Sequence, residues 1–168
     1  MHTVSIEQPP KDYYSWVECL KQLKTGIPNT GAFDVLRKGK CPEYAGIKAS
    51  LHGQIEETVN AIIANCVKTL KRDVSKYIDI NETDGIHIAF FRFGKYIDGC
   101  MFFTEMTFLD QSYCDDLRRE TIKHVTRFWS ETLHTLKKDI AAKNNFRMNE
   151  ELFLIYRVKL LKAYRFSE

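Results

Sequence analysis

The feature that most constrains the fold is a long stretch of helical hydrophobic periodicity between residues 51 and 77. Apolar residues recur there at intervals of three and four, the spacing of one face of an α-helix. They form two neighbouring stripes: Leu51, Ile55, Val59, Ile62 and Cys66 in the first, and Ile63, Val67, Leu70, Val74 and Tyr77 in the second. A helix with so wide an apolar surface contacts two or three neighbours, so the sequence predicts a central helix in a bundle.

The rest of the N-terminal half fits this bundle. Pro9-Pro10 ends a short arm, residues 1–10, and the following helical region covers 11–80. Within that region an amphipathic helix starts at Asp12 and closes near Gly26, because its apolar residues again recur at three and four. A turn at 28–31 and one or two further helical turns precede the long helix.

The hydrophobic periodicity changes in residues 86–104, and the pattern there predicts a β-hairpin. Two β-branched and aromatic runs flank Gly94-Lys95, which suits a two-residue turn with glycine first. One face of this hairpin holds Ile86, Ile88, Phe90, Ile97, Met101 and Phe103, and the other holds Phe91, Phe93, Tyr96 and Phe102. Both faces are apolar, and an isolated hairpin is only marginally stable in water. We therefore expect the second face to be buried, under the helix around Tyr13 and Trp16 or at a subunit interface.

Two helices complete the predicted fold. Residues 111–143 have one apolar side at helical spacing, and Asn144-Asn145 follows them. The last segment, 149–166, alternates like a strand but also stacks helically, and Glu150-Glu151 after a possible cap at Asn149 favours a helix. The prediction is one domain over 1–168, mainly α (α+β): four to six helices, two of them long and antiparallel, with the hairpin inserted between the long pair.

Composition and cysteine spacing indicate the compartment. The chain has 168 residues, of which 44% are hydrophobic, and no apolar run approaches the length of a membrane span. Its five cysteines are odd in number and at least 14 residues apart, so neither C-x-x-C zinc spacing nor a small disulfide framework is present. The first residues lack the features of a signal peptide. We expect a cytoplasmic protein in a reducing environment, with no membrane association.

The motifs give little support for catalysis, a metal or a cofactor. Phosphate-binding glycine loops and the G-x-S-x-G elbow are absent, and nothing selects a Cys–His pair such as Cys114 with His124. Glu131-x-x-His134 has the spacing of di-iron bundles, but a helical wheel places it, like Glu120, away from the apolar side. The sequence therefore predicts no cofactor and no catalytic or metal-binding residue.

The leading functional prediction is a non-catalytic interaction or regulatory protein. Its candidate partner-binding residues are those of the second hairpin face: Phe91, Phe93, Tyr96 and Phe102. Exposed apolar patches of this kind mark protein–protein contacts. The expected partner is another protein or a second copy of this chain.

The alternative prediction is a nucleic-acid-binding accessory protein. Basic residues share one flank of the helix at 111–143: Arg119, Lys123, Arg127 and Lys137. The segment from 137 to the end adds to this charge, with eight Lys or Arg against four Asp or Glu. Such a row can meet phosphates, although the acidic neighbours Glu120 and Glu131 would weaken its field.

Overall fold

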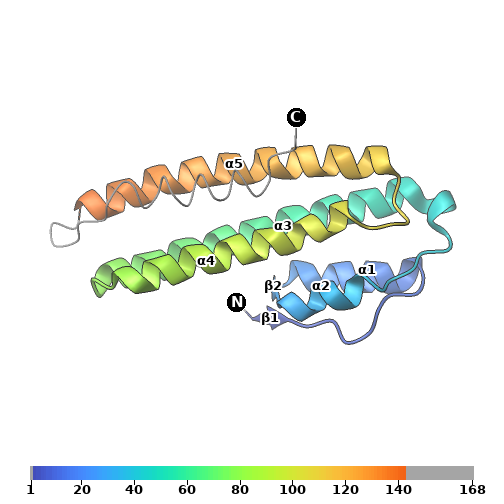
Figure 1. Ribbon diagram of the computed structural model, residues 1–168, viewed down its shortest axis with the longest axis horizontal. Helices are drawn as coiled ribbons and strands as arrows, with labels where there is room; N and C mark the ends of the chain where they lie inside the picture. The colour runs from blue at the N-terminus through green and yellow to red at the C-terminus, as the bar shows by residue number, and fades with distance from the viewer. Residues whose placement is uncertain (1, 143–168) are drawn as a thin grey trace. The chain divides into compact units, whose positions relative to one another are not determined.

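The computed structural model describes residues 2–142, and these residues are mainly helical (Figure 1). The two strands are β1 (Thr3–Val4) and β2 (Ile27–Pro28). The helices are α1 (Tyr13–Lys24), α2 (Thr30–Leu36), α3 (Tyr44–Asp79), α4 (Thr83–Cys100), the short 3-10 helix η1 (Met101–Thr104) and α5 (Gln111–Ala142). The predicted mainly α fold with a small β part is confirmed, as are its two long helices.

The chain divides into two compact units. Among the described residues, the first unit holds 2–66 and 95–121, and the second holds 67–94 and 122–142. The predicted organisation as one domain stays a prediction. The segment 149–166, expected to be a helix, lies outside the described residues.

Local capping explains where the short helices of the first unit begin. Asp12 precedes α1, and its carboxylate accepts a hydrogen bond from the Ser15 amide at 2.8 Å, while the Ser15 hydroxyl reaches back to the Asp12 amide. Asn29 precedes α2 and accepts from the Ala32 amide at 2.7 Å. Both caps satisfy backbone donors that the first helical turn leaves unpaired.

The N-terminal arm is tied to the first unit by a parallel strand pair. Thr3 pairs with Ile27 and Val4 with Pro28. The sequence did not indicate this pair, because two residues are too short to show a strand period. Gly26 lies next to it, and a Cβ there would stand 2.3 Å from the His2 carbonyl oxygen, so the close approach of the arm requires glycine.

Aromatic residues form much of the first unit's core. Trp16 is fully buried, donates from Nε1 to the Lys40 carbonyl at 2.9 Å, and has its ring centroid 5.6 Å from that of Phe108. Phe33 of α2 packs on Phe102 and Phe103, with centroid separations of 5.9 and 6.4 Å. These rings connect segments far apart in the sequence.

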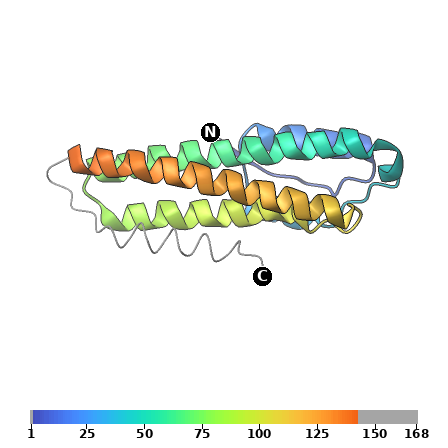
Figure 2. The same cartoon turned by 90° about the horizontal axis from the view of Figure 1, so that it is seen from above.

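The second unit consists of the end of α3, most of α4 and the later part of α5 (Figure 2). A tight turn joins α3 to α4, and Asn81 has a φ of 54° there, a left-handed conformation that asparagine tolerates. Gly85 comes after this turn and packs closely against Tyr77. A Cβ at Gly85 would lie 2.1 Å from a ring carbon of Tyr77. The core of this unit includes Leu70, Val74, Ile78, Ile86, Phe90 and Phe93.

The predicted hairpin at 86–104 is wrong, because this segment forms α4 and η1. The buried apolar side chains of α4 are those of Ile86, Ala89, Phe90, Phe93, Ile97 and Cys100, which follow each other at helical spacing. Burial of this stripe outweighs the strand propensity of β-branched and aromatic residues, which is a weak and context-dependent preference. Gly94 is inside the helix rather than at a turn.

The orientation of the two long helices also differs from the prediction. Within each unit α3 and α5 run in the same direction, and α4 runs in the opposite direction (Figures 1 and 2). The expected antiparallel arrangement of the two long helices is therefore wrong within each unit, where α4 is the helix antiparallel to both. None of the helices in residues 2–142 combines the length and apolarity that a membrane span requires.

Candidate functional site

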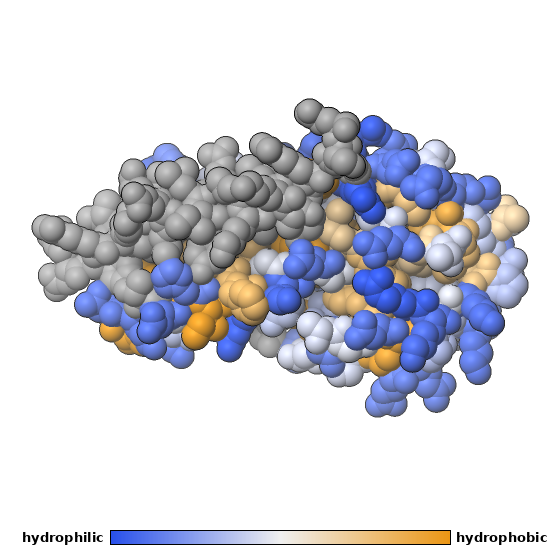
Figure 3. All heavy atoms as spheres, viewed as in Figure 1, coloured by the Kyte–Doolittle hydropathy of each residue, from blue (hydrophilic) through white to orange (hydrophobic). Residues whose placement is uncertain are grey.

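The outer face of α4 in the second unit carries two large apolar side chains. Ile88 is 47% exposed and Phe91 is 62% exposed, and they stand three residues apart on the helix. On the face seen in Figure 3, hydrophobic side chains reach the surface over α4, between hydrophilic ones. Ile80, in the preceding turn, is 56% exposed. We define Asp84, Ile88, Phe91 and Arg92 as the α4 outer face.

Charged residues flank the apolar pair in a regular order. Asp84 precedes Ile88 by one helical turn and Arg92 follows it by one turn, and both charged side chains are exposed. Residues four apart lie on the same side of a helix. The α4 outer face therefore has a negative end, an apolar middle and a positive end.

The structure separates the four residues predicted to bind a partner. Phe91 belongs to the α4 outer face, whereas Phe93 lies on the buried side of α4 and is 2% exposed. Phe102 is in η1, also 2% exposed, and packs on Phe33. Tyr96 is half-buried. The four residues do not form one surface. They were grouped by the alternation of side chains along a strand, whereas the segment is helical.

Ile88 is the residue of the α4 outer face that sequence reasoning placed on the wrong side. The hairpin pattern grouped it with Ile86 and Phe90, which the structure buries. A helical pattern starting from Ile86 passes through Phe90, Phe93 and Ile97 and leaves Ile88 outside. The sequence therefore contained this helical spacing, but it also contained the strand-like alternation of apolar residues, which pointed to a hairpin.

The basic residues predicted to bind nucleic acid have acidic partners nearby. Arg119 forms an ion pair with Asp116 on the preceding turn of α5. The Nε of Arg127 lies 3.0 Å from a carboxylate oxygen of Glu131. Lys123 is exposed, and Lys137 is in α5 with a side chain outside the described part of the structure. These pairs reduce the positive field along the helix, so the geometry gives no added support to nucleic-acid binding, which stays a prediction.

The buried thiols of Cys66, Cys100 and Cys114 lack the properties of nucleophiles. Burial raises the pKa of Cys66 to about 12 and that of Cys100 well above its ordinary value of 9.0. Burial also raises the pKa of Cys114. Reactive cysteines need a thiolate, so raised pKa values argue against the Cys–His pairs considered above. Glu131 and His134 are exposed, as the helical wheel indicated.

His52 is the centre of a polar cluster in the first unit. Its Nε2 lies 2.8 Å from the Tyr44 hydroxyl, which accepts a hydrogen bond from the Asp110 amide at 3.1 Å. Its ring stacks on Tyr113 with a centroid separation of 3.5 Å and an angle of 4°. Lys48 reaches a carboxylate oxygen of Asp110 at 3.0 Å. The cluster joins α3 to the start of α5, and we interpret it as structural.

This cluster predicts a pH-dependent stability. Burial lowers the pKa of His52 below its usual 6.5, although the carboxylates of Asp110 and Glu56 partly oppose this shift. The unfolded chain therefore binds the proton more readily, so stability is full above about pH 6.5 and falls as the pH decreases through the lower pKa of folded His52. Urea denaturation at about pH 7.5 and about pH 5.5 should show a smaller pH effect for His52→Gln than for the wild type.

Asp110 provides a separate pH window for this test. The hydrogen bond from Lys48 lowers its pKa below the usual 3.8, so its contribution is lost only in more acidic solution. Identical losses of stability in the wild type and His52→Gln between the two pH values would contradict the assignment to His52.

Comparison with known proteins gives no relative on which to base a function. No family model matches the chain, and neither the curated proteins nor the solved structures contain a match.

Proposed function

We propose that this chain is a non-catalytic interaction protein that associates with a second copy of itself through the α4 outer face. The observation that carries this proposal is the exposure of Ile88 and Phe91 on a helix whose opposite side is buried. Large apolar groups held together in water favour burial against another surface.

The energetics favour a weak, concentration-dependent association. With 62% of its surface exposed, Phe91 leaves about 120 Å² in water, and burying this area contributes about 3 kcal/mol. Two copies contribute about 6 kcal/mol before Ile88 is counted, against an association cost of at least about 4 kcal/mol. The patch alone is smaller than a standard stable interface, so the dimer belongs to the transient class.

The charge order supports a second copy as the partner. Two α4 helices can pair antiparallel around a two-fold axis that passes beside Ile88 of each copy. A residue one helical turn before Ile88 in one copy then faces the residue one helical turn after Ile88 in the other copy. Asp84 of one copy then faces Arg92 of the other, and the same pair occurs twice. Two opposite-charge pairs and an apolar centre make the face complementary to itself.

A charge-reversal series measured by sedimentation equilibrium tests this pairing. The weight-average mass of the wild type should rise with concentration. Asp84→Arg and Arg92→Asp should each weaken the dimer about two- to tenfold, because like charges then face each other twice. The double variant Asp84→Arg/Arg92→Asp should recover the wild-type affinity, since its opposite charges face each other again.

Each outcome of the series has a defined meaning. A wild type that stays monomeric at every concentration contradicts self-association. If the two single variants and the double variant dimerise with equal affinities, the antiparallel register is contradicted. Circular dichroism of every variant is the control for folding, and no large change is expected because both residues are exposed.

A further inference from the structure

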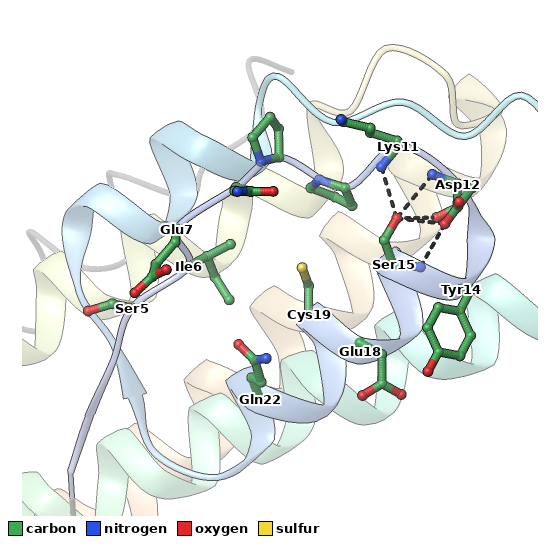
Figure 4. Close-up of a pocket in the computed structure, with 13 residues that line it drawn as sticks. Ser5, Ile6, Glu7, Lys11, Asp12, Tyr14, Ser15, Glu18, Cys19 and Gln22 are labelled. Carbon is green, nitrogen blue, oxygen red and sulfur yellow. Dashed lines mark hydrogen bonds between the residues drawn. The ribbon is translucent and has the colours of Figure 1, made fainter.

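A pocket of about 560 Å³ lies in the first unit between the N-terminal arm and α1 (Figure 4). Residues 5–10 of the arm form one side, and Lys11 and Asp12 together with residues of α1 from Tyr14 to Gln22 form the other. This volume is within the range of about 300–1,000 Å³ that is typical of small-molecule sites. The pocket is separate from the α4 outer face and belongs to the other unit.

The interior of the pocket is partly apolar. Ile6 and Pro10 are buried, and the thiol of the half-buried Cys19 points away from α1 into the gap between this helix and the arm (Figure 4). Gln22 contributes an amide from the same side as Cys19 (Figure 4). An aliphatic chain fits between such walls, because it buries methylene groups against them.

The border of the pocket is acidic. Glu7, Asp12 and Glu18 line it, against a single cation, Lys11. Glu18 forms an ion pair with Lys21 at 2.8 Å, so Glu7 and Asp12 supply most of the remaining negative charge. Hydrogen bonds from Ser15 lower the pKa of Asp12, which keeps this carboxylate ionised at neutral pH. Glu7 and Asp12 stand on opposite sides of the pocket (Figure 4).

We propose that this pocket binds an aliphatic primary ammonium ion, either a free amine or the lysine side chain of a peptide. The methylene chain lies against Ile6, Pro10 and Cys19, and the ammonium group is stabilised by the carboxylates of the border. Both sources present the same chemistry, a positive charge on a flexible apolar stem. The charge complementarity with Glu7 and Asp12 favours a cation over a neutral or anionic ligand.

Cys19 provides the reporter for the test, because the other four cysteines are buried. The full chain is treated with methyl methanethiosulfonate at one fixed pH, and mass spectrometry follows modification of Cys19. Pentane-1,5-diamine and Nα-acetyl-lysine methylamide are the two probes, and pentane-1,5-diol is the neutral control. We expect one or both amines to slow the modification in a saturable manner, and the diol to have no effect at the same concentrations. The stronger amine identifies the source.

Charge-neutral variants complete the test. Glu7→Gln/Asp12→Asn should weaken amine binding about tenfold, and asparagine keeps the cap of α1. Lys11→Gln should strengthen binding, because it removes the cation of the pocket. Equal protection by the diol, no protection by either amine, or an unchanged affinity in the double variant would each overturn the proposal.

Discussion

Replacing Phe93 with alanine should lower the free energy of unfolding by about 3–5 kcal/mol. Phe93 is 2% exposed and lies in the stripe of α4 that contributes to the core. Removing a buried ring loses its transfer free energy and leaves a cavity that the surrounding side chains fill only in part. Urea denaturation monitored by circular dichroism measures the change.

Phe91→Ala is the matched control, two residues away on the same helix. Phe91 is 62% exposed, so its truncation should change the free energy of unfolding by less than about 0.5 kcal/mol. In the hairpin interpretation both residues would belong to one buried face and both substitutions would be costly. Similar losses from the two variants would contradict the helical assignment of α4.

Gly99→Ala should be the second strongly destabilising substitution, by about 1–3 kcal/mol. A Cβ at this position would lie 2.4 Å from a ring carbon of Phe33, which is itself buried against Phe102 and Phe103. The ring cannot move aside without disturbing its neighbours, since packed cores have little free space. Thermal denaturation of Gly99→Ala and the wild type measures the loss.

Gly94→Ala controls for the general effect of alanine in α4. Within the part of the chain that the structure describes, no heavy atom outside the local helix backbone lies within 4 Å of a Cβ built at Gly94, and the φ of Gly94 is not positive. Alanine should therefore stabilise the helix by up to about 1 kcal/mol. A destabilised Gly94→Ala would instead indicate the turn that the sequence suggested, where glycine is needed for its positive φ.

The helices with clear amphipathic spacing could be predicted from the sequence. The predicted start at Asp12 agrees with α1, and the predicted helix at 111–143 agrees with α5. The two apolar stripes between residues 51 and 77 lie within α3. These segments carry one periodicity, and the residues that interrupt it are capping or turn residues.

The segment of α4 could not be assigned because it carries two periodicities at once. Ile86, Ile88 and Phe90 alternate like a strand, while Ile86, Phe90 and Phe93 also follow helical spacing. Local propensity favoured the strand, and the choice depended on contacts with residues distant in the sequence. Tertiary burial of this kind commonly overrides an intrinsic preference.

The candidate site was predicted only in part for the same reason. Phe91 was identified as apolar surface, but Phe93 and Phe102 were grouped with it although the structure buries both. Ile88 and its charged neighbours became visible as one face only with the helical register. The polar cluster around His52 was also hidden, because Tyr44, Asp110 and Tyr113 lie far apart along the chain.

Sedimentation of Phe91→Asp is the most direct test of whether the α4 outer face holds two copies of this chain together. A carboxylate at this position would be desolvated in the middle of the interface, so the dimer should weaken at least about tenfold. Tyr14→Asp is the matched control, because Tyr14 is an exposed aromatic residue on α1 that lies outside the α4 outer face.

We expect the wild type and Tyr14→Asp to show the same rise of weight-average mass with concentration, and Phe91→Asp to stay at the mass of one chain, 19.7 kDa for the unsubstituted sequence. All three proteins should have the same helical content. A folded Phe91→Asp that associates as strongly as the wild type would contradict the account.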